Sequence, residues 1–192
     1  SQNDIIAAGG SVHSLNISVG VPFGEGNTEI FYLKSFMKGV EYLSKFDNAS
    51  INSGHSYQTF EPGITINMNG IYKHESKKTL AREKNLIYLS KPLGVGYLLA
   101  AYFKNSDLLD SKDFNEVLSS MKLSNKNASE IAKKHQTKSM TDISGFGLAS
   151  HLGDICKSSG LTANIQLDEK LLINPNLEIL KKFQSTGYES NY

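Results

Sequence analysis

The residues with the clearest capacity for chemistry lie in one short stretch, Thr141–Gly147, which reads Thr-Asp-Ile-Ser-Gly-Phe-Gly. Its carboxylate, Asp142, lies near two hydroxyl side chains and precedes a Gly-x-Gly turn. Apolar residues at helical spacing predict a helix over about 148–156, whose first backbone N–H groups would be unpaired and suit an anion. A carboxylate there would repel phosphate unless a cation lay between them, and Mg²⁺ prefers carboxylate and phosphate oxygens. The alternative is that Asp142 caps the helix or a turn.

The first part of the chain has the pattern of a sheet covered by a helix. Residues 14–21 alternate apolar and polar side chains, which predicts a half-buried strand, and residues 63–72 repeat that alternation. Between them, apolar residues at three-to-four spacing over residues 28–43 predict a helix with a wide apolar face. Residues 49–55 predict a short strand that runs into a glycine turn at Gly54.

The later part of the chain combines two expected strands with helices. Residues 85–90 and residues 161–167 each predict a strand, and a helix is expected over 97–104. The segment Lys91–Gly96, which links the first of these strands to that helix, ends in Gly-Val-Gly. Two glycines at such a point can hold phosphate, or they can simply pack a strand tightly against a helix.

A boundary between two domains is expected over residues 73–84, which show neither a strand nor a helix pattern. This segment carries a small basic run that is typical of a solvated loop. The prediction is therefore a first domain over residues 1–72, a linker over residues 73–84, and a second domain over residues 85–192.

Composition excludes several classes of protein. The chain has 39% hydrophobic and 20% charged residues, as ordinary globular proteins do. Its net charge of +1 gives no basis for attraction to nucleic acid or to anionic lipid, and no apolar run approaches the length of a membrane span. No secretory signal is visible, and the only cysteine, Cys156, rules out an internal disulfide and fits a reducing compartment. A cytoplasmic location is expected.

Five blocks of the sequence, in register, resemble one known family. The stretch at Asp142, continued by Leu148 and His151, resembles the C-terminal-domain signature of the selenophosphate synthetases, also called selenide, water dikinases. The other blocks are similar to that family's motifs in the same order; they are Asn3–Gly10, Ser53–Ser56 with Glu61-Pro62, Lys91–Gly96, and Gly187–Asn191. One departure is Ser53, which stands where the family has glycine and could either contact phosphate or crowd the backbone.

The resemblance implies a fold and an activity. The implied fold is α+β, with two domains of the aminoimidazole ribonucleotide synthetase-like type, each a β-sheet with helices packed on one face. The implied reaction converts ATP, selenide and water into selenophosphate, AMP and phosphate. The implied cofactors are ATP and Mg²⁺. The implied assembly is a homodimer formed through strands of the N-terminal domain, which residues 14–21 and 63–72 would supply here.

The resemblance also implies roles for particular residues. Asp4 and Asp142 match metal ligands from the two domains, and the turn at Ser53, Gly54 and His55 matches one that approaches the nucleotide. For His55, a plain hydrogen-bonded turn residue is the alternative. His151 is expected to serve packing, with bracing of the metal loop as the alternative.

No catalytic residue is expected within this chain. The family's cysteine or selenocysteine, with its lysine, belongs to a segment upstream of the position of Ser1, and Cys156 matches a core position. The chain is therefore expected to be inactive alone. Two alternatives remain open: another ATP-binding enzyme of the same superfamily, in hydrogenase maturation or purine biosynthesis, and a non-catalytic nucleotide-binding or dimerisation module.

Overall fold

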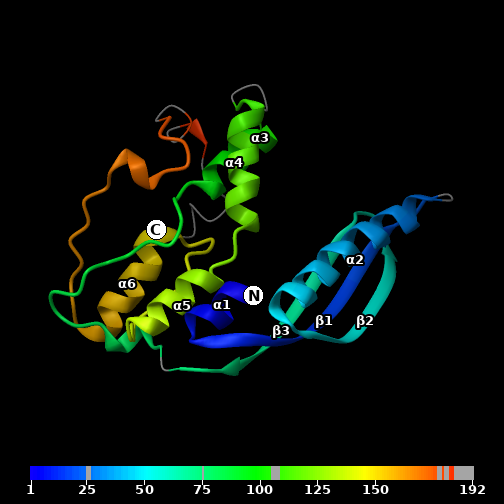
Figure 1. Ribbon diagram of the computed structural model, residues 1–192. Coiled ribbons are helices and arrows are strands. Elements are labelled where there is room, and N and C mark those ends of the chain that lie inside the picture. Colours follow the sequence, from blue (N-terminus) through cyan, green and yellow to red (C-terminus); the bar gives the residue numbers. More distant parts are fainter. Residues whose placement is uncertain (25–26, 75, 105–108, 177–178, 180–181, 184–192) are drawn as a thin grey trace. The chain divides into compact units, whose positions relative to one another are not determined.

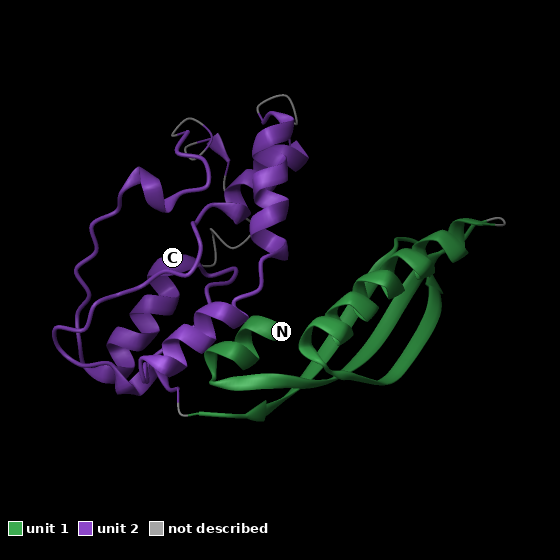
Figure 2. Ribbon diagram, in the orientation of Figure 1, with its two compact units in different colours: residues 1–75 green, residues 76–192 purple. Residues whose placement is uncertain are grey.

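The computed structural model describes residues 1–24, 27–74, 76–104, 109–176, 179, 182 and 183. The chain forms two compact units, residues 1–75 and residues 76–192 (Figure 2). Residues 76–84, expected as part of a linker, belong to the second unit, where a single helical turn, η1 (Lys78–Leu80), packs against a later helix.

The first unit is a three-stranded sheet with helices (Figure 1). The central strand pairs in parallel with one neighbour and antiparallel with the other, and the sheet order is β2-β1-β3. Its elements are α1 (Gln2–Ala7), β1 (Gly10–Pro22), α2 (Asn27–Asp47), β2 (Ser50–Thr59) and β3 (Gly63–Tyr72).

The core of the first unit lies between α2 and one face of the sheet. The alternation predicted for residues 14–21 places Leu15, Ile17 and Val19 on that face, and all three are buried. Val40 of α2 is buried against them, with Phe36 and Met37 packed alongside. The expected strands at 14–21 and 63–72 and the expected helix at 28–43 are therefore confirmed.

The expected glycine turn after residues 49–55 is wrong, because β2 continues as a strand to Thr59 and Gly54 lies in its middle. The segment carries serine, asparagine and glycine, and its exposed side chains show no apolar alternation. Its strand conformation comes instead from its partner, since residues 50–59 pair with β1 in parallel register. Pairing of this kind overrides local composition.

The second unit is helical in the part of the chain that is described, apart from one isolated bridge between Leu93 and Leu172. Leu98 of α3 and Val117 of α4 are fully buried in its core. Its elements are η1, α3 (Val95–Lys104), α4 (Ser111–Lys122), α5 (Lys126–Lys134), α6 (Gly147–Ser159) and η3 (Glu169–Leu171).

The strands expected at residues 85–90 and 161–167 do not form. An extended segment becomes a strand only when a neighbour completes its backbone hydrogen bonds, and within the described residues of the second unit neither segment pairs with one. The three side chains Leu86, Ile87 and Tyr88 are consequently exposed. None of the helices in the described ranges has both the length and the apolar character that crossing a bilayer requires.

Candidate functional site

The segment Thr141–Phe146, called the Asp142 loop below, immediately precedes α6. Asp142 is half-buried, and the Thr141 hydroxyl donates to its backbone oxygen at 3.1 Å. Among the described residues the Asp142 carboxylate has no hydrogen-bond or ion-pair partner. Because α6 begins at Gly147 with Phe146 at its N-cap, Asp142 lies too early in the chain to cap this helix, and that part of the alternative is wrong.

Two glycines keep the space beside this loop open. A Cβ atom placed on Gly145 or Gly147 would meet no heavy atom within 4 Å. Gly147 has φ of +76°, a left-handed conformation that other residues adopt at a cost, and its N–H closes a turn on the Ser144 carbonyl at 2.9 Å. The loop therefore presents a free carboxylate next to uncrowded backbone.

One side chain of α6 returns to the Asp142 loop. The Ser144 backbone N–H donates to Nε2 of His151 at 3.3 Å, and the Ser144 hydroxyl oxygen lies 3.2 Å from the same nitrogen. The Phe146 ring lies beside the imidazole, with 6.3 Å between centroids. His151 thus braces the Asp142 loop, which was the alternative to a plain packing role.

Lys78 fastens α6 and the segment before the Asp142 loop to η1. Its carbonyl accepts hydrogen bonds from the hydroxyls of Ser139, at 3.4 Å, and Ser159, at 2.9 Å. Its Nζ forms an ion pair with Asp154 of α6 at 2.8 Å. The basic run that includes Lys78 was expected to be a solvated loop. The Lys78 side chain is indeed exposed, but it lies in the helical turn η1 and is tied to α6. The basic composition of residues 77–84 did not predict the contacts of Lys78 with α6 and Ser139.

The ion pair makes a contribution to stability that depends on pH. Its hydrogen bond and charge lower the pKa of Asp154 from its usual 3.8. A lowered folded-state pKa means that the stabilisation is complete above the usual value and is lost as pH falls through the lowered one. Asp154→Asn should therefore reduce the melting temperature at pH 7 by about 2 °C or less, because both partners are exposed. The difference should shrink as the pH falls below 3.8 and through the lowered pKa of Asp154.

Thermal unfolding followed by circular dichroism between pH 2 and pH 7 checks this expectation. Glu116→Gln, which removes the looser pair between Lys112 and Glu116 at 4.0 Å, is a control that should change little. A gap between wild type and Asp154→Asn that stayed constant down to pH 2 would contradict the role given to the ion pair.

The other candidate metal ligand, Asp4, lies on α1 in the first unit. Its carboxylate is exposed, with Oδ2 3.1 Å from the amino nitrogen of Ser1. The helix is held by Ile6, which is buried, and by Ile5, which packs against the core of the sheet. The position of Asp4 therefore depends on how α1 packs against the sheet.

Gly70 of β3 is what allows α1 to lie so close to the sheet. A Cβ atom there would be 2.4 Å from Cγ2 of Ile5 and 3.2 Å from the Ser11 carbonyl. Gly70→Ala should therefore lower the free energy of unfolding by about 1–3 kcal/mol. Urea denaturation measures the loss. Gly63→Ala in the same strand, where a Cβ would meet nothing within 4 Å, is the matched control, and equal effects would disprove the proposed clash.

The predicted nucleotide-binding residues Ser53, Gly54 and His55 lie along β2 and are exposed. The Ser53 hydroxyl donates to Oδ1 of Asn16 at 2.8 Å, and the His55 ring stacks on Tyr57 at 6.3 Å. The structure therefore places these residues on an edge strand rather than in a turn. Ser53 was expected either to contact phosphate or to crowd the backbone. Its hydroxyl instead bonds Asn16 on the neighbouring strand β1.

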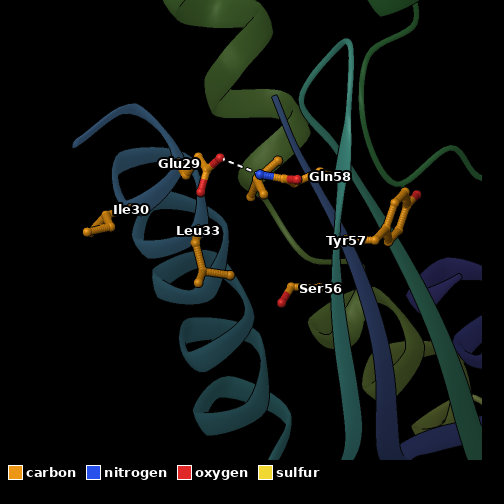
Figure 3. A pocket seen from close by; sticks show the side chains of 7 residues that line it. Glu29, Ile30, Leu33, Ser56, Tyr57 and Gln58 are labelled. Atoms are coloured by element: carbon orange, nitrogen blue, oxygen red, sulfur yellow. Dashed lines mark hydrogen bonds between the residues drawn. The ribbon is translucent and has the colours of Figure 1, made fainter. Parts of the chain in front are cut away.

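A groove of about 360 Å³ runs between β2 and α2 (Figure 3). Ile30 and Leu33 supply apolar walls, and a hydrogen bond of 2.7 Å joins Gln58 Nε2 to Glu29 across it. Gly54 and His55 line a smaller adjoining cavity of about 170 Å³. No cationic side chain lines either space in the described part of the chain, so neither by itself suits a phosphate group.

The segment Lys91–Gly96 serves packing. Nζ of Lys91 donates to the carbonyls of Ser120 and Leu123 at the end of α4, both at 3.1 Å, where a cation is favourable. Burial lowers the pKa of Lys91 from its usual 10.5. Gly94 has φ of +124°, and a Cβ on it would be 2.9 Å from the Tyr97 ring. These contacts favour tight packing over phosphate binding.

Magnesium fits the candidate residues only in part. In the described ranges no group of three or more His, Cys, Asp or Glu side chains could hold a metal ion. Mg²⁺ beside a nucleotide, however, uses one or two carboxylates together with phosphate oxygens and water. Asp142, half-buried and without a partner for its carboxylate among the described residues, meets that requirement. The Asp4 carboxylate of the first unit is exposed and is also an oxygen ligand of the kind that Mg²⁺ prefers.

Two further expectations concern residues outside the metal site. Cys156 was expected at a core position, but on α6 it is only half-buried. The block Gly187–Asn191 lies outside the described residues.

Comparison with known proteins identifies the family. The family described as "AIR synthase related protein, C-terminal domain" matches residues 82–189. Curated relatives named selenide, water dikinase include those of Caldanaerobacter subterraneus subsp. tengcongensis (32% identity; 77% of this chain, 43% of the relative), Sulfurimonas denitrificans (25%; 96% and 52%) and Pseudomonas straminea (29%; 93% and 49%). The chain spans about half the length of these relatives.

Solved structures agree on the fold. A structure titled "AaThiL complexed with AMPPCP and TMP" matches with a TM-score of 0.64 and 17% identity, over 98% of this chain and 60% of that one. E. coli HypE, a hydrogenase maturation protein, matches with a TM-score of 0.58 and 13% identity, over 83% of this chain and 49% of that one. The expected α+β, AIR synthase-like fold is confirmed, although the described residues of the second unit lack the expected sheet. The chain belongs to the AIR synthase-related family, and its curated relatives are selenide, water dikinases.

Proposed function

We propose that the polypeptide containing this chain makes selenophosphate, converting ATP, selenide and water into selenophosphate, AMP and phosphate. The observation that carries the proposal is the free Asp142 carboxylate on a braced, glycine-rich loop, within a sequence whose curated relatives are named selenide, water dikinase. ATP and selenide are the proposed substrates. The fold alone is shared with ThiL and HypE and supports no choice among activities.

The proposed roles follow the chemistry of each residue. Asp142 would contribute a carboxylate oxygen to Mg²⁺, which when bound neutralises clustered phosphate charge. Asp4, on the first unit, is proposed as a metal ligand in its own right. Ser53, Gly54 and His55 would contact the nucleotide from β2, through a hydroxyl, an uncrowded backbone and an imidazole. The Asp142 loop contributes rigidity, because a carboxylate held in one place loses little freedom when a cation binds.

The thiol of this chain is not assigned to the reaction. Cys156 is half-buried and lies near the C-terminal end of α6, not at a helix N-terminus, which is one of the places where cysteine nucleophiles are activated. We therefore propose no catalytic residue within residues 1–192. Their contribution would be to hold the nucleotide and its metal.

We also propose a homodimer formed through the sheet of the first unit. Of the two strands expected to pair, β1 is central in this sheet and already has a neighbour on each side, whereas β3 lies at an edge and is largely exposed. An exposed edge presents unpaired backbone N–H and C=O groups that readily pair with another strand. Size-exclusion chromatography with light scattering should give twice the monomer mass, and a monomer at high concentration would remove this part of the proposal.

The activity is tested by ³¹P NMR of the protein expressed from its complete gene. Incubated with ATP, Mg²⁺ and selenide, it should form AMP and a selenophosphate signal in equal amounts, and neither without selenide. Turnover of ATP that is indifferent to selenide would favour another activity of the superfamily. Nucleotide binding without turnover would favour a binding module.

A further inference from the structure

The contact between His151 and Ser144 defines how the Asp142 loop is held. A backbone N–H is a fixed donor, so the Ser144 amide can bond Nε2 at 3.3 Å only if that nitrogen carries a lone pair. The neutral imidazole must then carry its proton on Nδ1. That atom is buried and has no hydrogen-bond partner among the described residues.

The unpartnered Nδ1 makes this arrangement costly, since a buried polar atom without a partner loses its hydration and gains no hydrogen bond in return. A histidine serving only to fill space could be replaced there by an apolar ring at no such cost. Nε2 instead lies within hydrogen-bond distance of two Ser144 atoms. The hydrogen bonds of the His151 ring are therefore made by Nε2 to the Asp142 loop.

The rest of the loop has few other restraints. Its preceding segment is anchored at Ser139 and its following helix at Asp154, both through Lys78. Between these anchors, the glycines at 145 and 147 have open space around them. Two described hydrogen bonds of its backbone hold Ser144, which lies two residues after Asp142. The Gly147 N–H donates to the Ser144 carbonyl at 2.9 Å, and the Ser144 N–H donates to the His151 ring; the second of these contacts comes from a side chain.

We propose that His151 is a positioning residue, which holds the Asp142 carboxylate in place for a magnesium–nucleotide complex by accepting the Ser144 N–H on Nε2. This inference rests on the proposed role of Asp142 as a metal ligand. It assigns His151 no contact with substrate or metal. It requires an acceptor at Nε2, and an imidazole protonated on Nδ1.

Two variants separate the acceptor from the ring. His151→Phe keeps an aromatic ring beside Phe146 but has no acceptor, whereas His151→Gln keeps an acceptor oxygen near the position of Nε2. His135→Phe, at the exposed end of α5, makes the same substitution outside the loop. In calorimetric titration with Mg²⁺·ATP, His151→Phe should weaken binding about tenfold or more, while His151→Gln and His135→Phe should stay close to wild type.

Two NMR measurements need no nucleotide. Long-range ¹H–¹⁵N spectra of wild type should show His151 protonated on Nδ1. Hydrogen exchange should show a protected Ser144 amide in wild type and in His151→Gln, and an unprotected one in His151→Phe, with the amides of α3 and α4 unchanged in all three. A proton on Nε2, or an unprotected Ser144 amide in wild type, would overturn the inference.

The outcomes also separate this inference from the proposed function. Wild-type affinity in a His151→Phe protein whose Ser144 amide has lost protection would overturn the positioning role while leaving Asp142 as a ligand. Unchanged affinity in Asp142→Asn, or no binding of Mg²⁺·ATP by wild type, would contradict the proposed function itself, and His151 would then have no ligand to position. The tautomer and the amide protection would still be measured in that case.

Discussion

Asp142→Asn is expected to weaken binding of Mg²⁺·ATP by about 100-fold, because loss of a direct ligand should cost at least as much as loss of a residue that supports one. Asparagine keeps the size of the side chain and one oxygen, but it removes the charge that a hard cation prefers. The melting temperature should hardly change, since the carboxylate has no partner among the described residues and does not cap α6. Calorimetric titration and thermal unfolding of the same protein samples give both quantities.

The matched control for this substitution is Asp110→Asn. Asp110 caps α4 by accepting the Asp113 N–H at 2.7 Å, and asparagine caps a helix about as well. This variant changes the net charge of the same unit equally and should bind nucleotide as wild type does. A reduced melting temperature with unchanged affinity in Asp142→Asn would mean that Asp142 is a structural residue.

Leu98→Ala should produce the largest loss of stability among the changes considered. Leu98 is 0% exposed at the centre of the second unit's core. Removing its branched end leaves a cavity that the packed helices can only partly fill, at a cost of about 2–5 kcal/mol. Hydrogen exchange of the α3 and α4 amides, followed in increasing denaturant, measures the loss where it occurs.

The same truncation at the surface serves as its control. Leu123 follows α4 and is 58% exposed, so Leu123→Ala should cost under about 1 kcal/mol. If the two variants were equally stable, the cluster around Leu98 would not be the core of this unit, and the packing described for α3 and α4 would be incorrect.

Elements with a strong period of their own were predictable from the sequence. β1, β3 and α2 have alternating or helical apolar patterns, and the structure forms them close to the expected bounds. β2 was half missed, because its length comes from pairing with β1 and not from its own residues. Residues 85–90 and 161–167 show the reverse error, since neither an apolar run nor an alternation provides by itself a neighbour to pair with.

The candidate site was predictable to a smaller extent. Residue types and spacing placed a carboxylate before a helix. They left open whether Asp142 caps that helix, which the observed start of α6 excludes. The contacts of Lys78 join residues 61 to 81 positions apart, and no local pattern encodes such pairs. The activity itself rested on the resemblance of whole motifs, because a free carboxylate beside glycines is compatible with many ligands.

The most direct measurement of the central claim, that Asp142 holds the metal of a bound nucleotide, is paramagnetic broadening by Mn²⁺·ATP. Mn²⁺ accepts the same oxygen ligands as Mg²⁺ and broadens the NMR signals of nearby amides. In wild type the amides of Thr141, Asp142 and Ile143 should lose intensity first, and Asp142→Asn should abolish the effect. Full intensity at these three amides, at concentrations of Mn²⁺·ATP that broaden signals elsewhere in the second unit, would contradict the account.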